Sequence, residues 1–124
     1  MSRALNLQPD DPEANYSMGM LYAQEGEAQR ASEYLHRAIE LRPNYPEALN
    51  NLGILLVRGH EFAKAEEEFK SCIQVEPGFD QSYLNLARLY ALMGNKQNAT
   101  EVLNTLIRLQ PQNAAARKAL EMMK

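Results

Sequence analysis

Histidine, cysteine and clustered acidic residues could support acid–base, nucleophilic or metal chemistry, but in this sequence they do not combine into a recognisable set. Neither His36 nor His60 has a cysteine or an acidic pair at the spacing of metal ligands. The sequence repeats a pattern described below, and Cys72 stands at the position where another copy has Ala38. This position predicts a buried, inert thiol. The acidic run 66–68 is typical of a solvated helix face. We therefore expect no catalytic residue, no metal, no cofactor and no enzyme activity.

The composition argues against several classes of function. Of the 124 residues, 45% are hydrophobic and 23% are charged, as in ordinary folded proteins. A net charge of −3 argues against a nucleic-acid-binding surface. Apolar runs such as residues 54–57 are too short to cross a membrane, and no secretion signal is recognisable. A single cysteine excludes an internal disulfide framework, so we expect a reducing, cytoplasmic location.

A segment that recurs at a constant interval organises the whole chain. The prolines that close its copies are evenly spaced, at Pro9, Pro43, Pro77 and Pro111. The interval is 43 − 9 = 34 residues, and a fixed period of this size indicates an array of repeated structural units. The period predicts one domain over residues 1–124, with complete units at 12–45, 46–79 and 80–113. Residues 1–11 resemble the end of a preceding unit, and residues 114–124 resemble the beginning of a following one.

Each unit is predicted to contain two helices. Asp11 and Pro12 form a helix start, with an N-cap residue followed by proline at the first helical position. Apolar residues with helical spacing follow, and in the second unit they are Leu49, Leu52, Leu55 and Leu56. The first helices are expected to end at glycines, namely Gly26, Gly59 and Gly94. The short loops predict that the two helices of a unit pack antiparallel.

Small residues recur where helices would have to approach closely. One set, spaced by one repeat period, is Gly19, Gly53 and Ala87. A second set with the same spacing is Ala31, Ala65 and Ala99. Glycine inside a helix costs about 1 kcal/mol relative to alanine, so the two glycines need a packing reason. Close contact between helices provides that reason.

The unit resembles the tetratricopeptide repeat, and the resemblance covers essentially the whole chain. Counted from residues 12, 46 and 80, that family has a small residue at place 8, an aromatic at place 11, alanine at place 20, an aromatic or leucine at place 24 and proline at place 32. These places hold Gly19, Tyr22, Ala31, Leu35 and Pro43, then Gly53, Leu56, Ala65, Phe69 and Pro77, then Ala87, Tyr90, Ala99, Leu103 and Pro111. Asn15 at place 4 and Lys96 at place 17 depart from the pattern. The resemblance implies an all-α fold, a right-handed superhelix of antiparallel helix pairs.

The resemblance also implies a non-catalytic interaction module that binds a protein or peptide partner. In this family the first helix of each unit lines a concave face, mainly through places 2, 5, 6, 9, 12 and 13. The expected peptide-binding residues are therefore Tyr16, Met20, Asn50, Asn51, Ile54, Arg58, Leu84, Asn85 and Arg88. Such a mixture of apolar, amide and arginine side chains can bury a peptide's side chains and satisfy its backbone.

Asn51 and Asn85 share place 6 of their units. In the related repeats of the nucleocytoplasmic glycosyltransferase that modifies serine and threonine, asparagines at this place bind peptide backbone. A carboxamide can pair with one peptide unit, although it can equally serve contacts between helices. The family's clamp for chaperone C-terminal carboxylates uses five places, which here hold Tyr16, Met20, Asn51, Gln81 and Asn85. None of these is a cation, so we expect no such clamp.

Two alternatives remain open at this level. Because the partial units at the two ends are complementary, the array could be an assembly scaffold that associates weakly, end to end. It could also be the substrate-recognition arm of a larger enzyme, such as a peptide glycosyltransferase. We expect neither a nucleic-acid nor a membrane partner.

Overall fold

Seven α-helices make up residues 10–123, the part of the chain described by the structure, which is a computed structural model. They are α2 (Pro12–Gln24), α3 (Ala28–Leu41), α4 (Pro46–Arg58), α5 (Phe62–Val75), α6 (Asp80–Leu92), α7 (Lys96–Leu109) and α8 (Ala114–Met123). First helices begin at the first place of each predicted unit, at Pro12, Pro46, Asp80 and Ala114. The predicted all-α array is confirmed. The helix end expected within residues 1–11 lies almost entirely outside the described residues.

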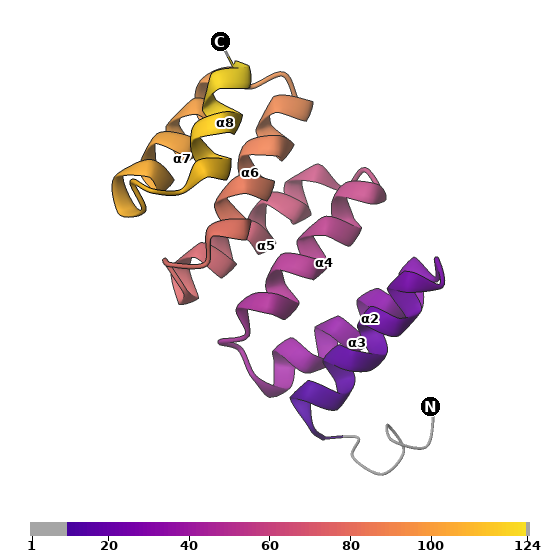
Figure 1. Cartoon of the computed structure of the whole chain (residues 1–124). Helices are drawn as coiled ribbons and strands as arrows, with labels where there is room; N and C mark the ends of the chain where they lie inside the picture. The colour runs from indigo at the N-terminus through magenta and orange to yellow at the C-terminus, as the bar shows by residue number, and fades with distance from the viewer. Residues whose placement is uncertain (1–9, 124) are drawn as a thin grey trace.

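The helices form antiparallel pairs that follow one another along an elongated array (Figure 1). Within the pairs, α2 packs on α3, α4 on α5 and α6 on α7, and each second helix also contacts the first helix of the next pair. The first helices α4, α6 and α8 contact one another in succession, as α4 with α6 and α6 with α8. The first helices therefore lie next to one another along one side of the array.

Small residues set the distance between the two helices of a pair, as predicted. A Cβ atom added to Gly53 would lie 2.5 Å from the ring of Phe69, and one added to Gly19 would lie 3.0 Å from the Leu35 side chain. The alanines of the second predicted set are completely buried, namely Ala31, Ala65 and Ala99. Helix backbones thus approach at the places where the sequence has little or no side chain.

The core runs through the array as linked clusters. One joins α3 to α4 around Leu35 and Leu52, and another joins α5, α6 and α7 around Phe69 and Leu103. Cys72 is buried as predicted; its sulfur accepts a hydrogen bond from the Ser82 hydroxyl, and burial raises the pKa of the thiol. A protonated, enclosed thiol of this kind serves packing.

The helix ends follow the local sequence, with one departure. The Asp11 side chain accepts a hydrogen bond from the backbone N–H of Glu13 at 3.3 Å, which confirms the predicted cap. Gly26 and Gly94 follow their helices with φ of +81° and +79°. Gly59 does end α4, but its φ is −86°, and His60 takes the left-handed conformation instead, with φ of +62°. The glycine stands one residue before the position that needs it.

Candidate functional site

Three hollows lie in succession along the side of the array where the first helices lie next to one another. The first, of about 220 Å³ between α2 and α4, is lined by Met20, Ala23, Gln24, Leu35, Asn51, Ile54, Leu55 and Arg58. The second, of about 270 Å³ between α4 and α6, is lined by Ile54, Val57, Arg58, Phe69, Asn85, Arg88, Leu89 and Leu92. The third, of about 240 Å³ between α6 and α8, is lined by Leu84, Ala87, Arg88, Ala91, Leu103, Ala115, Ala119, Met122 and Met123. We call the three together the inner groove.

The inner groove is mainly apolar, and part of its apolar lining is open to water. Leu92 is 61% exposed at the second hollow, and Met122 is 77% exposed at the third. Apolar side chains that line a concave feature and stay open to water are typical of an interaction surface. The contribution of α8 was missed by the sequence analysis, which treated residues 114–124 only as the beginning of a following unit.

Two arginines stand at the borders between hollows. Arg58 lines both the first and the second hollow, and Arg88 lines both the second and the third. Arg88 donates from Nη1 to Oδ1 of Asn85 at 3.1 Å. Within residues 10–123 neither guanidinium forms a salt bridge with a carboxylate. The groove therefore combines apolar hollows with positive charge between them.

The two place-6 asparagines tie successive units together. Nδ2 of Asn51 donates to the Tyr16 hydroxyl at 3.1 Å, and Nδ2 of Asn85 donates to Oδ1 of Asn50 at 3.0 Å. Both bonds join residues 35 apart, so place 6 of one unit lies against place 5 of the unit before it. Nδ2 of Asn51 also donates to the Glu47 carbonyl oxygen at 2.8 Å. Much of the bonding capacity of these amides is therefore used within the protein.

Asn50 is not available on the groove surface as the sequence analysis expected. It is 2% exposed, and its Oδ1 is the acceptor for Asn85. A residue at place 5 points toward the next first helix, and in the second unit that helix covers it. Asn50 therefore supports the groove from beneath its surface and does not offer a contact point to a ligand.

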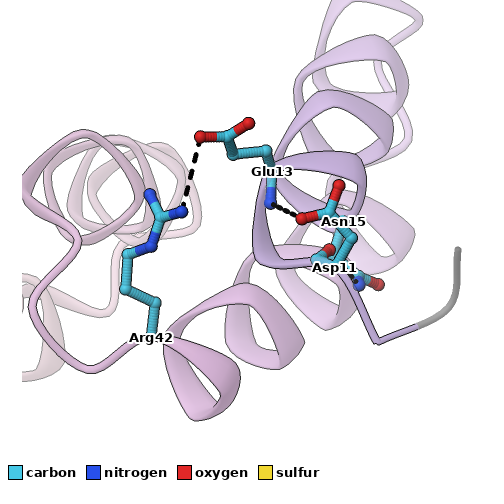
Figure 2. A network of polar contacts seen from close by, with 4 residues as sticks. All are labelled: Asp11, Glu13, Asn15 and Arg42. Atoms are coloured by element: carbon cyan, nitrogen blue, oxygen red, sulfur yellow. Dashed lines mark hydrogen bonds and ion pairs between the residues drawn. The ribbon is translucent and has the colours of Figure 1, made fainter.

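Tyr16, at place 5 of the first unit, is half-buried and touches the inner groove through its hydrogen bond with Asn51. Its ring lies 5.2 Å from that of Tyr45, and burial raises the pKa of the phenol. The guanidinium of Arg42 lies 4.6 Å from the centre of the Tyr45 ring and 3.4 Å from Oε2 of Glu13. Figure 2 shows Arg42 reaching across to Glu13 near the start of α2. These contacts fix the end of α2 that carries Tyr16.

Seven of the nine predicted residues line the inner groove: Met20, Asn51, Ile54, Arg58, Leu84, Asn85 and Arg88. The structure brings them together along one face. Tyr16 and Asn50 instead hold the amides of the neighbouring unit in place. The described residues contain no group of three or more histidine, cysteine or acidic side chains that could hold a metal ion. No helix within residues 10–123 combines the length and apolar character that a membrane crossing requires.

Comparison with known proteins identifies the repeat. One family model of the tetratricopeptide repeat matches residues 56–123, and a second model of the same repeat matches residues 1–46 and 16–74. The chain belongs to the tetratricopeptide repeat family. The comparison with curated proteins finds no match.

Solved structures with the same fold include two that are described as containing tetratricopeptide repeats (TPR). MamA superposes with a TM-score of 0.85 at 22% identity, over 98% of this chain and 71% of that one. The first TPR of Spaghetti (RPAP3), bound to the HSP90 peptide SRMEEVD, gives 0.81 at 17% identity, over 91% and 92% of the two chains. YrrB, described as a TPR protein with an unusual peptide-binding site, gives 0.80 at 27% identity, over 90% of this chain and 57% of that one.

Proposed function

We propose that this TPR chain is a non-catalytic interaction module that binds a peptide segment of a partner protein in the inner groove. The observation that carries the proposal is the row of three apolar hollows along α2, α4, α6 and α8. A row of hollows fits a ligand that is itself a chain, since each hollow can receive one of its side chains. Burial of one leucine-sized side chain contributes roughly 1.5–3 kcal/mol. Three buried side chains would therefore offset much of the free-energy cost of ordering a peptide.

The polar groups of the groove would orient the peptide backbone. Because Nδ2 of Asn51 donates to two acceptors within the protein, its carbonyl oxygen is what remains for a ligand. Among residues 10–123 no group donates to Oδ1 of Asn51, whereas Oδ1 of Asn85 already accepts from Arg88. We infer that Asn51 accepts one backbone N–H of the peptide, in place of the paired contacts of a full asparagine ladder.

The structural neighbours support this class of function. One of them holds a peptide, and another is described as having a peptide-binding site. Both share the fold of this chain over most of its length.

The test is selection of ligands from a displayed library of random peptides, followed by affinity measurement with groove variants. A length of about twelve residues suits an extended chain that rises ~3.3 Å per residue past hollows spaced by about 10 Å. Leu92→Ser removes an exposed apolar side chain from the second hollow. Leu109→Ser is the matched control, because Leu109 is similarly exposed, at 54%, and lies at the end of α7, a second helix.

We expect Leu92→Ser to weaken the selected peptides about tenfold, the equivalent of about 1.4 kcal/mol, and Leu109→Ser to leave the affinity unchanged. Fluorescence anisotropy with labelled peptides measures both. Selected peptides that lose affinity with Leu109→Ser but not with Leu92→Ser would place the binding surface on the second helices α3, α5 and α7 and reject the proposal.

A further inference from the structure

The positions of Arg58 and Arg88 say more about the ligand than the hollows alone. Each arginine lies on the border between two apolar hollows, so the lining alternates between apolar and positively charged segments along the groove. A ligand that fills adjacent hollows has to pass each guanidinium on the way. The side chain that it presents there decides whether that charge is matched.

Neither guanidinium has a carboxylate partner among residues 10–123. The salt bridges within residues 10–123 are Arg30–Glu27, Arg42–Glu13, Lys64–Glu61 and Lys70–Glu66, and none of them reaches Arg58 or Arg88. The chain as a whole is acidic, with a net charge of −3. Two uncompensated cations on the inner face of an acidic protein are a local feature that complements an anionic ligand.

Arg88 is also held in position. Its Nη1 donates to Oδ1 of Asn85, and Asn85 donates in turn to the buried Asn50. This chain of bonds limits the movement of the guanidinium and leaves its remaining N–H groups for a ligand. A donor that is fixed before binding loses less conformational entropy when the ligand arrives.

We propose, on the basis of the function proposed above, that the inner groove selects peptides in which acidic side chains alternate with apolar ones. One carboxylate pairs with Arg58 and another with Arg88, while apolar side chains enter the hollows on either side. Successive packed helices lie about 8–10 Å apart, and a polyproline II chain, which rises ~3.1 Å per residue and has about three residues per turn, covers that distance in about three residues with the same face toward the groove. Both the apolar and the acidic side chains should therefore recur at about every third residue.

The carboxylates belong to internal side chains and not to the peptide's C-terminus. A peptide has a single terminus, whereas the arginines stand at two separate borders of the groove. The places that hold a terminal carboxylate in chaperone-binding relatives carry no cation here, as the sequence analysis found.

The library selection tests this when the peptides selected on the wild type are sequenced and compared with the input. We expect aspartate and glutamate to be enriched between apolar residues. Arg58→Gln and Arg88→Gln should each weaken the selected peptides about tenfold. Arg37→Gln is the matched control, because Arg37 is an exposed arginine on α3, whose guanidinium lies 5.3 Å from the centre of the Tyr34 ring, away from the inner groove. Thermal melting followed by circular dichroism checks that each variant is folded.

The outcomes separate this inference from the function on which it rests. Peptides that bind in the groove but show no acidic enrichment, with affinities indifferent to both arginine changes, overturn the inference and leave the proposed function standing. A loss of affinity on amidation of the C-terminus, with internal acidic residues dispensable, also overturns it. Failure of the library to yield any ligand rejects both the function and the inference. Unchanged affinity after amidation, together with loss on Glu→Gln changes within the peptide, supports the inference.

Discussion

Replacing Gly53 by alanine would place a methyl group against the buried ring of Phe69. The added Cβ would lie 2.5 Å from Cε1 and 2.8 Å from Cδ1 and Cζ of that ring. Carbon atoms pack best at about 3.5–4.0 Å, so the ring or the helix would have to move by about 1 Å. Phe69 is only 1% exposed, which leaves the ring little room to move.

The expected change in stability is the difference between two opposing effects. Overpacking of a filled core costs roughly 1–3 kcal/mol, while alanine in a helix interior gains about 1 kcal/mol over glycine. We expect Gly53→Ala to lower the free energy of unfolding by about 1 kcal/mol, or the melting temperature by about 4 °C. Gly19→Ala is the matched control, since its Cβ would lie 3.0 Å from the Leu35 side chain, a milder approach that should leave stability nearly unchanged.

A second substitution at the same contact makes the test sharper. The third unit carries Ala87 and Leu103 at the places where the second carries Gly53 and Phe69. Adding Phe69→Leu to Gly53→Ala should therefore recover stability, with a favourable coupling of about 1 kcal/mol in a double-mutant cycle. Urea unfolding of the four proteins measures it. A Gly53→Ala protein that is as stable as the wild type, with no coupling to Phe69→Leu, would refute the close-packing argument.

Four further predictions concern charge, backbone conformation and assembly. The hydrogen bond from the Tyr90 hydroxyl lowers the pKa of Glu66 in the folded state. The stability that this bond contributes is present above the ordinary carboxyl pKa of about 4.3 and is lost as the pH falls through the lower folded value. Glu66→Gln should therefore destabilise the protein at pH 7 but hardly at pH 2. Burial raises the pKa of Glu68, so its charged form is unfavourable in the folded state. Glu68→Gln should stabilise the protein at pH 7, and the gain should vanish below the ordinary carboxyl pKa. Urea unfolding at pH 7 and pH 2 checks that Glu66→Gln and Glu68→Gln change the free energy of unfolding in opposite directions. His60→Gly should raise the free energy of unfolding by about 0.5–1 kcal/mol, because it relieves the φ of +62° at some cost in unfolded-state entropy, and a lower melting temperature would contradict this. The exposure of Met122 at the end of the array predicts weak end-to-end association that Met122→Lys reduces; a wild type that stays monomeric in light scattering at millimolar concentration would rule it out.

Most of the fold could be predicted from the sequence, because its helix starts and close-packing positions recur at the same places of successive units. Helices start at Pro12 and Pro46 because proline at the first helical position costs no hydrogen bond, and close packing at Gly53 follows from a glycine that otherwise weakens its helix. Each of these signals is local and returns at the same place of another unit. The left-handed conformation of His60 was not predictable in the same way, because a glycine stands beside it at residue 59.

The candidate site was predicted in outline but not in its bonding. The family pattern located seven groove residues on one face, because helical spacing fixes which side chains share that face. It did not predict that Asn85 donates to Asn50, since that bond depends on how far one unit is shifted against the next. The place of Arg58 and Arg88 at the borders between hollows likewise depends on the packing of neighbouring helices.

Amide chemical-shift mapping of isotope-labelled protein shows whether a peptide binds along the inner groove. The protein is titrated with a peptide selected from the library, and the shifts are assigned along the chain. We expect the largest shifts on α4 and α6, around Ile54, Arg58 and Arg88, and smaller ones on α2 and α8. Shifts concentrated on α3, α5 and α7, with the first helices unaffected, would contradict binding along the inner groove.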